Sequence, residues 1–251
     1  MRAAFLKKKG KAEKAFEWKE TERPKCDNDK VIIKVKAFGL NYADVMARLG
    51  LYPEMPPMPC ILGYDVCGEI VEVGSEVTKL KVGDHVVALT RFGGYAEYAE
   101  GDPRVCVVVD ENIDLHKQLA MATQLSTSYC AAIESVNLNE GDNVLVHAAA
   151  GGVGLGIVQI ALHKKCNVIA IASKEEKLRL LKDMGVQHCI NYKKEDIYQK
   201  LKTLDLHKKI DVIYDSVAGG YNIKKGYKAM NSGGKYVLFG ASKLSGHKNI
   251  F

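Results

Sequence analysis

The sequence predicts an α/β protein in two parts: a β-rich first part and a second part with a doubly wound parallel sheet. Three observations support the prediction. Short apolar or alternating runs between glycine, proline and aspartate dominate residues 1–115, strand-like and helix-like runs alternate from residue 143 onward, and a glycine-rich turn joins one such strand to a helix. A length of 251 residues suits one large domain or two ordinary ones. We therefore expect one domain over residues 1–118 and a second over residues 119–251.

Four runs of the first part have the composition of strands, because they are apolar or alternate apolar with polar residues. They span residues 31–36, 67–73, 85–89 and 105–109. Three prolines crowd residues 55–59, and we expect an extended loop there, since proline disfavours helix at the residue before it. These features predict a compact β-rich domain.

The second part alternates strands with helices. Residues 115–136 are compatible with a helix, and the expected strands after them span residues 143–147, 167–172, 188–191, 211–214 and 235–239. Helices are expected over residues 154–164, 175–184 and 196–204. Alternation at this spacing is typical of βαβ units, in which helices cover both faces of a parallel sheet.

The composition excludes several classes of protein. Apolar residues make up 47% and charged residues 26% of the chain, which argues against a disordered or fibrous protein. The net charge of +6 comes from scattered lysines, densest in residues 7–14, with pairs at 193–194, 208–209 and 224–225 that we interpret as turns. These lysines are not interleaved with aromatic residues, so a solvated surface is favoured over a nucleic-acid interface. The N-terminal cluster would suit an anionic membrane, since each basic residue near such a surface contributes about 1 kcal/mol.

The seven cysteines include no Cys-x-x-Cys pair, which argues against a disulfide framework and a structural zinc site. Reduced thiols favour an intracellular, cytoplasmic location. Residues 144–162 carry no formal charge and have the length of a membrane span, but they contain His147, Gln159 and four glycines. A strand, a glycine turn and a helix therefore describe this stretch better.

The glycine turn is the most informative motif and reads Ala149-Ala150-Gly151-Gly152-Val153-Gly154. Gly151 and Gly154 match the G-x-G-x-x-G pattern of dinucleotide-binding proteins, whereas Ala149 replaces its first glycine. Glycines let the backbone approach a pyrophosphate, and the following helix offers free N–H groups and a partial positive charge. The motif predicts dinucleotide binding, and the alternative is a merely structural turn.

The residues after the second strand favour NADPH over NADH. NAD-binding units usually place an Asp or Glu about 20 residues after the glycines, where it holds the ribose 2′-hydroxyl. Here Ser173-Lys174 ends the strand and Lys177 follows, which suits a 2′-phosphate, although Glu175 and Glu176 are close. The alternative is that both lysines are only the solvated first turn of a helix.

Residues 141–154, followed by Gln159, resemble the signature stretch of the zinc-independent quinone oxidoreductase (zeta-crystallin-like) branch of the medium-chain dehydrogenase/reductase superfamily. Leu162 departs from that stretch, because a basic residue is usual there. Residues 39–44 and 48–53 are similar to the N-terminal active-site segment of the branch, and residues 211–215 and 233–235 also match. Residues 219–227 and 236–246 are nearest in character to the vesicle amine transport proteins.

The resemblance implies a GroES-like β domain followed by a Rossmann domain, and it implies roles for named residues. Asn41 and Thr127 would lie near the nicotinamide, and Gly152 and Val153 near the pyrophosphate. The residues implied around the 2′-phosphate are Ser173, Lys177 and Tyr192. For Tyr192 the alternative is an ordinary aromatic residue at the end of a strand.

The resemblance also implies chemistry without a metal ion. Zinc-dependent relatives have Gly-His-Glu where this chain has Gly63-Tyr64-Asp65, and four cysteines where residues 91–106 hold only Cys106. The implied reaction is hydride transfer from NADPH to a quinone or an α,β-unsaturated carbonyl, small molecules that spread the resulting charge. Tyr52 would orient or protonate the substrate, or else pack as a loop aromatic against Pro53. Asn41 would hydrogen-bond the substrate carbonyl or the cofactor.

A second functional hypothesis follows from the vesicle amine transport relatives: a cofactor-binding, weakly catalytic protein that associates peripherally with vesicle or mitochondrial membranes. Full-length relatives are usually homodimers and continue for several tens of residues past the region that matches residues 235–246. We therefore expect a C-terminally truncated chain whose Rossmann sheet is incomplete.

Overall fold

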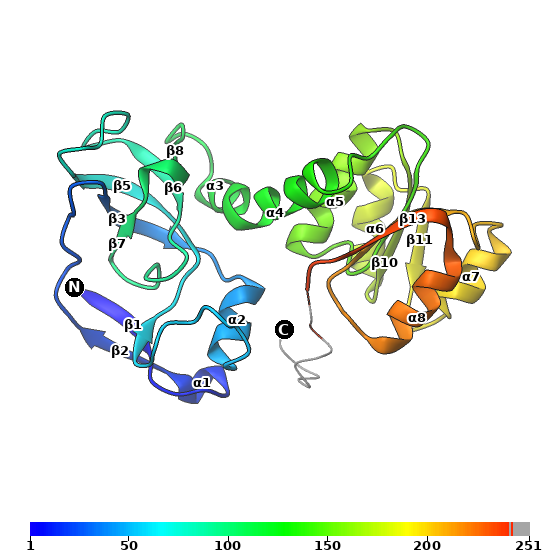
Figure 1. Cartoon of the computed structure of the whole chain (residues 1–251), viewed down its shortest axis with the longest axis horizontal. Helices are drawn as coiled ribbons and strands as arrows, with labels where there is room; N and C mark the ends of the chain where they lie inside the picture. The colour runs from blue at the N-terminus through cyan, green and yellow to red at the C-terminus, as the bar shows by residue number, and fades with distance from the viewer. Residues whose placement is uncertain (241, 243–251) are drawn as a thin grey trace. The chain divides into compact units, whose positions relative to one another are not determined.

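The computed structural model describes residues 1–240 and 242, and the chain divides into two compact units (Figure 1). Unit 1 is Met1–Gln124, and unit 2 begins at Leu125. Unit 1 is rich in strands, and unit 2 alternates strands with helices, so the expected α/β fold class is confirmed.

Unit 1 contains a five-stranded antiparallel sheet with the strand order β7-β3-β5-β6-β8. The core on one side of this sheet is rich in β-branched residues, among them Val31, Ile33, Ile70 and Val86, none of which is exposed. The strands are β3 (Val31–Phe38), β5 (Asp65–Val73), β6 (His85–Leu89), β7 (Tyr98–Gly101) and β8 (Cys106–Val108).

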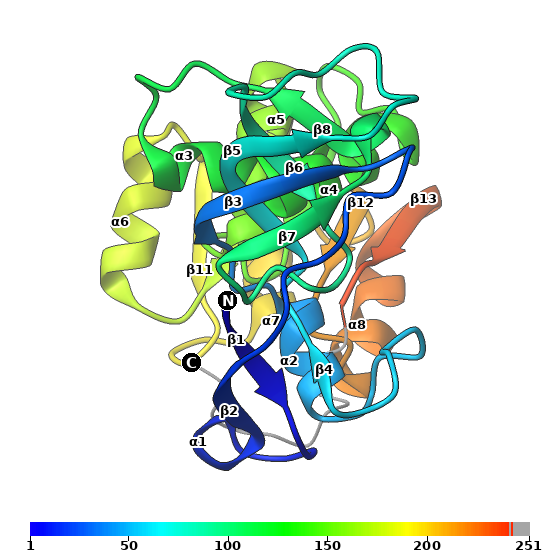
Figure 2. The ribbon, with the colours of Figure 1, turned by 90° about the vertical axis from the view of Figure 1, so that its left-hand side faces the viewer.

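A smaller sheet of unit 1 has the order β2-β1-β4 and lies next to two short helices, as Figure 2 shows. The core cluster packed around this smaller sheet includes Leu6, Ala47, Leu62 and Tyr95. The elements are β1 (Arg2–Leu6), α1 (Ala12–Ala15), β2 (Phe16–Glu20), α2 (Tyr42–Arg48) and β4 (Cys60–Ile61). Helix α2 and the start of β5 carry the residues that matter for the site below.

The helix expected over residues 115–136 is confirmed over most of its length, but it alternates between α-helical and π-helical turns. Its parts are α3 (Leu115–Ala120), a π-helical turn (Met121–Leu125), α4 (Ser126–Tyr129) and a second π-helical turn (Cys130–Glu134). Such π-helical turns are rare in proteins and occur often near functional sites.

Unit 2 is built on a five-stranded parallel sheet with the order β11-β10-β9-β12-β13. Helices α5 and α6 pack on one face, through Ile157, Val158 and Leu181, while α7 and α8 pack on the other, through Leu201 and Ala229. The strands are β9 (Asn143–Val146), β10 (Asn167–Ala172), β11 (His188–Asn191), β12 (Ile210–Asp215) and β13 (Met230–Leu238). The helices are α5 (Gly152–His163), α6 (Glu175–Asp183), α7 (Ile197–Thr203) and α8 (Gly220–Ala229).

Residues 144–162 form β9, the glycine turn and most of α5, as the sequence predicts. Within residues 1–240 and 242, the structure contains no helix that combines the length and the apolar character needed to cross a membrane.

Several sequence expectations were wrong in detail. Lys224 and Lys225 lie inside α8 rather than in a turn. The helix was not expected from sequence, because Gly220 and Gly226 have low helix propensity. The strand expected over residues 105–109 is shorter, since Pro103–Val105 forms a 3-10 helical turn capped by Asp102. Residues 241 and 243–246, which contributed to the resemblance, lie outside the described part of the chain.

Candidate nucleotide-binding edge and active-site residues

The turn between β9 and α5 has a left-handed residue at its start. Ala148 adopts φ 50°, a conformation that side chains other than glycine seldom take. Two backbone hydrogen bonds hold the turn: Gly151 N–H donates to the Ala148 carbonyl at 2.8 Å, and Ala149 N–H donates to the Ile171 carbonyl at 3.0 Å. The chain therefore reverses direction at Ala148, one residue before the position at which the dinucleotide pattern has its first glycine.

Gly154 is required by the close packing of α5 against the end of β9. A Cβ atom at this position would lie 2.4 Å from the Ala148 carbonyl oxygen, a rigid backbone atom. Gly156 is similarly close to α4, because a Cβ atom there would lie 2.4 Å from Ser128 Oγ. Close approach of helix and strand is the role of the third glycine in dinucleotide-binding turns.

The N-terminus of α5 has the features that bind a pyrophosphate. Gly151 is its N-cap in an extended conformation, and no side chain caps the free N–H groups of the first turn. Gly151 and Gly152 are exposed, Ala150 and Val153 are half-buried, and Gly154 is buried. An anion therefore has access to uncapped N–H groups at the positive end of the helix dipole, so these residues fit a dinucleotide.

The ends of β10 and β11 bring two further predicted residues into neighbouring turns. Ala172 and Asn191 are partners in the parallel register, and Tyr192 N–H donates to the Ala172 carbonyl at 3.2 Å. Ser173 follows β10 and is half-buried, while the Tyr192 side chain is 52% exposed. Ser173 and Tyr192 thus lie at the same edge of the sheet as the glycine turn.

The acidic residues of this edge are already engaged by other groups. Glu175 Oε1 accepts a hydrogen bond from Asn191 Nδ2 at 2.9 Å and pairs with Lys194 Nζ at 2.8 Å. These two partners hold the pKa of Glu175 below its usual value. Lys174 pairs with Glu176 at 3.4 Å, whereas Lys177, exposed in the first turn of α6, forms no ion pair within the described residues. Among the described residues, Lys177 is thus a cation outside any ion pair, beside two carboxylates that lysines already neutralise.

Of the predicted site residues, Asn41 and Tyr52 belong to unit 1, and the others belong to unit 2. Thr127 is a half-buried residue of α4. Asn41 is the N-cap of α2 and is 7% exposed. Its Nδ2 atom donates to Asp65 Oδ1 at 2.9 Å, and Asp65 Oδ2 accepts from Thr123 N–H at 3.2 Å. The buried Asp65 carboxylate therefore fixes the rotamer of the Asn41 amide.

A second buried carboxylate, that of Asp44, fixes the backbone of the same region. It accepts hydrogen bonds from Asn41 N–H at 3.0 Å, from Gly63 N–H at 3.1 Å and from the Tyr95 hydroxyl. Burial raises the pKa of Asp44 to about 6, against the opposing effect of these hydrogen bonds. Asp44 thus joins the start of α2 to the loop before β5.

Tyr52 has a specific partner in unit 1. Its hydroxyl lies 3.0 Å from the hydroxyl of Tyr64, and the two rings meet edge to face with centroids 6.2 Å apart. Phe92 completes the cluster, at 6.2 Å from the Tyr52 ring and 6.1 Å from the Tyr64 ring. Burial, followed by the hydrogen bond with Tyr64, raises the pKa of Tyr52 to about 12. The phenol therefore keeps its proton at neutral pH.

The segment Gly63-Tyr64-Asp65 connects the two candidates, since Tyr64 contacts Tyr52 and Asp65 contacts Asn41. The sequence analysis used this segment only to assess zinc and missed its role in positioning Asn41 and Tyr52. The available signal was its match in position to the Gly-His-Glu segment of zinc-dependent relatives. Within residues 1–240 and 242, no three His, Cys, Asp or Glu side chains converge as metal ligands.

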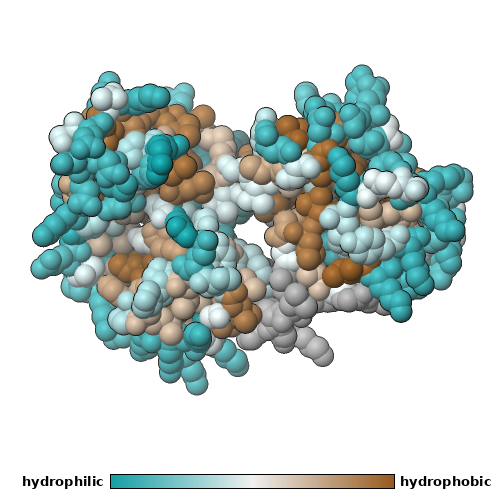
Figure 3. All heavy atoms as spheres, viewed as in Figure 1, coloured by the Kyte–Doolittle hydropathy of each residue, from teal (hydrophilic) through white to brown (hydrophobic). Residues whose placement is uncertain are grey.

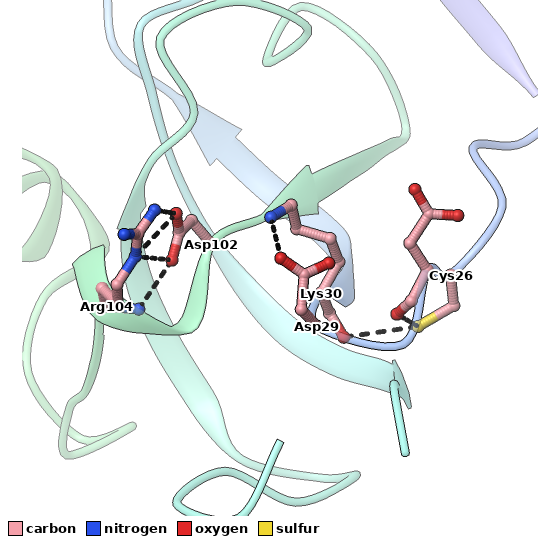
Figure 4. A network of polar contacts seen from close by, with 6 residues as sticks. Cys26, Asp29, Lys30, Asp102 and Arg104 are labelled. Carbon is pink, nitrogen blue, oxygen red and sulfur yellow. Dashed lines mark hydrogen bonds and ion pairs between the residues drawn. The ribbon is translucent and has the colours of Figure 1, made fainter. Parts of the chain in front are cut away.

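Polar clusters elsewhere in unit 1 are explained by surface ion pairs. Figure 4 shows Asp102 with Arg104, and Lys30 with Asp29. Hydrogen bonds from the Arg104 side chain lower the pKa of Asp102 to about 2. Cys26 Sγ donates to the Lys30 carbonyl at 3.5 Å. These ion pairs hold the loops before β3 and after β7, and they do not form an arrangement typical of a catalytic site.

Comparison with protein families identifies two regions. Residues 27–116 match the alcohol dehydrogenase GroES-like domain, and residues 152–251 match the zinc-binding dehydrogenase family. The GroES-like character expected for the first domain is thereby confirmed, and the second region begins at the first residue of α5.

Several characterised proteins are similar to this chain. The synaptic vesicle membrane protein VAT-1 homolog of Rattus norvegicus is 34% identical over 214 residues, covering 85% of this chain and 52% of the relative. A probable quinone oxidoreductase of Schizosaccharomyces pombe is 37% identical, with 87% and 65% covered. The 2-methylene-furan-3-one reductase of Solanum lycopersicum is 35% identical, with 86% and 56% covered. The chain thus spans about half the length of the vesicle membrane relative.

Solved structures agree in fold. The quinone oxidoreductase of Pseudomonas syringae pv. Tomato DC3000 superposes with a TM-score of 0.88 at 30% identity, covering 96% of this chain and 74% of that one. The Escherichia coli quinone oxidoreductase in complex with NADPH superposes with a TM-score of 0.89 at 28% identity, with 96% and 73% covered. The chain therefore belongs to the medium-chain dehydrogenase/reductase superfamily, close to its quinone oxidoreductases and VAT-1 homologues.

Proposed function

We propose that this chain is the cofactor-binding and substrate-binding part of an NADPH-dependent oxidoreductase that reduces a quinone or an α,β-unsaturated carbonyl without a metal ion. The observation that carries the proposal is the arrangement at the carboxyl edge of the unit 2 sheet. There the uncapped N-terminus of α5 suits a pyrophosphate, and Lys177, which forms no ion pair with a described residue, suits a 2′-phosphate.

Three side chains are proposed to select the 2′-phosphate. Ser173 contributes a hydroxyl, Lys177 a cation and Tyr192 an exposed aromatic ring with a hydroxyl. Glu175 is held by Asn191 and Lys194, so it does not offer the free carboxylate that NAD-binding units use for the ribose. A phosphate at this edge gains charge-assisted hydrogen bonds, which are stronger than neutral ones.

The proposed reduction adds one hydride and one proton to a conjugated acceptor. When bound, the reduced nicotinamide supplies the hydride. The protein then has to orient the acceptor and provide a hydrogen-bond donor for the oxygen on which negative charge develops. Conjugation spreads that charge, so the proposed acceptor needs no Lewis acid.

Tyr52 and Asn41 are proposed as the groups that touch the substrate or the nicotinamide. The Tyr52 phenol holds a proton that it can donate, and its partner Tyr64 holds the ring in place. Asn41 donates one amide hydrogen to Asp65, and its side-chain oxygen accepts from Asp44 N–H in the capping box of α2, so its second amide hydrogen is the group proposed to meet a ligand.

The activities named for similar proteins support this assignment. The fission yeast relative is a probable quinone oxidoreductase, the tomato relative is a reductase of 2-methylene-furan-3-one, and the bacterial structure holds NADPH. Both named substrate types have a carbonyl conjugated to a carbon–carbon double bond.

The test is NADPH oxidation by the purified chain with a panel of quinones, enones and matched saturated ketones. Turnover of the conjugated acceptors, with none for the saturated ketones, supports the proposal. Saturable NADPH binding without turnover of any acceptor contradicts it.

That second outcome would favour the alternative of a cofactor-binding protein with little catalysis at a membrane surface. The observation behind this alternative is the similarity to a synaptic vesicle membrane protein. Flotation with anionic liposomes, with salt controls, tests it directly, because membrane attachment through scattered lysines weakens as salt rises.

A further inference from the structure

Unit 2 contains a pocket at the edge of its sheet opposite the glycine turn. Helices α7 and α8 both end at this edge, and β12 and β13 both begin there. The pocket between them has a volume of about 500 Å³, within the range of small-molecule sites. It is lined by Tyr198, Gln199, Lys202, His207, Lys208, Lys225, Tyr227, Lys228 and Met230.

The described residues of the lining are strongly basic and include no acidic residue. Figure 3 shows hydrophilic side chains gathered on the surface formed by α7 and α8. Lys202, Lys208 and Lys228 are exposed and form no ion pair within the described residues. Positive charges held close together without a negative charge repel one another. Binding of an anion in the pocket would therefore lower the free energy.

Neighbouring lysines show that this lack of partners is local. Lys200 pairs with Glu195 at 3.4 Å, and Lys209 pairs with Asp205 at 2.5 Å. Glu195 and Asp205 are therefore engaged by lysines that do not line the pocket. Lys202, Lys208 and Lys228 form no ion pair with any described residue and can meet a ligand from solution.

His207 reports the same positive field. Its pKa is lowered, first by burial and then by the charges of Lys202 and Lys208. All three groups therefore lie close enough to repel one another. The neutral imidazole that results still offers one N–H donor to an anion.

Aromatic residues form the other wall. The Tyr198 hydroxyl donates to the Asn222 carbonyl at 2.9 Å, which fixes its ring, and Tyr227 is 64% exposed while stacking on Tyr236 at 5.3 Å. A wall of this kind packs against the apolar or ring portion of a ligand whose charged group meets the lysines.

Helix dipoles explain only part of the pattern. Lys202 and Lys228 lie in the last turns of α7 and α8, where cations complement the negative end of a helix. Lys208 and His207 lie in the loop after α7, so the dipoles do not account for them. The convergence of all four on one cavity requires a further reason.

We propose that this pocket binds a phosphate-bearing anion, with the phosphate held by Lys202, Lys208 and Lys228 and the rest of the ligand against Tyr227. The site is separate from the proposed nucleotide edge and does not depend on the proposed function. The same phosphate chemistry occurs in free phosphorylated metabolites and in phosphoinositide headgroups of membranes.

The test uses the full chain and inorganic pyrophosphate as the probe, observed by amide NMR so that the bound site is located. We expect saturable shifts at Lys202, Lys208 and Lys228, separate from any shifts at the α5 turn. The triple variant Lys202→Gln, Lys208→Gln, Lys228→Gln should bind pyrophosphate at this site about tenfold more weakly or worse, since several charge-assisted hydrogen bonds are lost.

A matched control removes three exposed lysines of unit 1 that lie outside the ion pairs of the described residues: Lys25→Gln, Lys79→Gln, Lys117→Gln. This variant has the same net charge as the first, and we expect it to bind pyrophosphate as the unsubstituted chain does. An equal loss of affinity in both variants, or no saturable shift around the pocket, overturns the proposal.

Vesicles containing phosphatidylinositol 4-phosphate distinguish the two sources of phosphate. Flotation of the unsubstituted chain but not of the pocket variant, with release by pyrophosphate, supports a membrane headgroup. Pyrophosphate binding at the pocket without flotation supports a free phosphorylated ligand.

Discussion

The hydroxyl groups of Tyr52 and Tyr64 lie 3.0 Å apart, so one of them donates to the other and a single hydroxyl hydrogen remains for a third group. The backbone of Tyr64 is held independently of this hydrogen bond, because its carbonyl accepts from Thr90 N–H at 3.0 Å. The pair therefore presents one oriented phenol donor rather than two rotating ones.

Replacing Tyr64 by phenylalanine should lower kcat about threefold to tenfold for a conjugated acceptor and leave KM nearly unchanged. The reason is that Tyr52 keeps its ring packing but loses the hydrogen bond that orients its hydroxyl. Steady-state kinetics checks this, with Tyr98→Phe, a substitution on β7, as the control. A Tyr64→Phe variant that changes only KM would show that Tyr64 acts on binding instead.

Asp44 should make the stability of unit 1 fall as pH rises. Its folded-state pKa of about 6 lies above the ordinary value of 3.8, so the folded chain binds this proton more tightly than the unfolded chain. The stabilising contribution is present below about pH 4 and disappears as pH rises through 6. At about 1.4 kcal/mol per pKa unit, the difference amounts to roughly 3 kcal/mol.

Urea unfolding of the unsubstituted chain and of Asp44→Asn between pH 4 and pH 7 measures this effect. We expect the variant to be less stable at acidic pH, because the amide cannot accept from both Asn41 N–H and Gly63 N–H, and to lose part of the pH slope. Asp84→Asn, which changes a carboxylate in an exposed turn, should keep the slope. An identical slope in all three proteins would falsify the assignment.

Gly154→Ala should destabilise unit 2 by about 1–3 kcal/mol, the usual result of overpacking, because the new Cβ would lie 2.4 Å from the Ala148 carbonyl oxygen. Gly151→Ala is the matched comparison, since its Cβ would lie 3.2 Å from the same atom and its φ of −86° suits alanine. Thermal unfolding distinguishes the two variants. Equal melting temperatures would mean that α5 shifts to accommodate the methyl group.

Lys177→Ala should weaken NADPH binding about tenfold and leave NADH binding nearly unchanged, because only NADPH carries the phosphate that Lys177 is proposed to hold. Lys174→Ala is the control of equal charge change, since Lys174 is engaged by Glu176. Fluorescence titration of both nucleotides gives the dissociation constants. If the Lys174 variant loses as much NADPH affinity as the Lys177 variant, the preference for NADPH comes from the overall positive charge of this edge and not from a specific contact with Lys177.

The sheet of unit 2 was largely predictable, because its buried strands are uninterrupted apolar runs with short turns between them. β10 and β11 have the bounds expected from sequence. β13 begins earlier than expected, at Met230, since Gly233 and Gly234 interrupt its pattern while pairing with β12 holds it extended. The propensities of single residues do not include the stabilisation that comes from pairing with another strand. For the same reason, β1 and β2 were not predicted from sequence.

The candidate site was predictable where the backbone motif is contiguous, as in the turn from Ala150 to Gly154. It was not predictable where a partner comes from elsewhere in the chain. Asp65 orients Asn41, and Tyr64 orients Tyr52, through contacts that exist only after unit 1 has folded. The left-handed Ala148 was also missed, because alanine gives no local signal for a positive φ.

The central position of β9 in its sheet has a consequence for the motions of unit 2. Val144 and Val146 pack on one face of the sheet and Leu145 on the other, and none of the three is exposed. Strands pair with β9 on both sides, so no local fraying frees its amides. Their exchange with deuterium requires opening of the whole unit, and these three amides should therefore be among the slowest to exchange and should report its global unfolding.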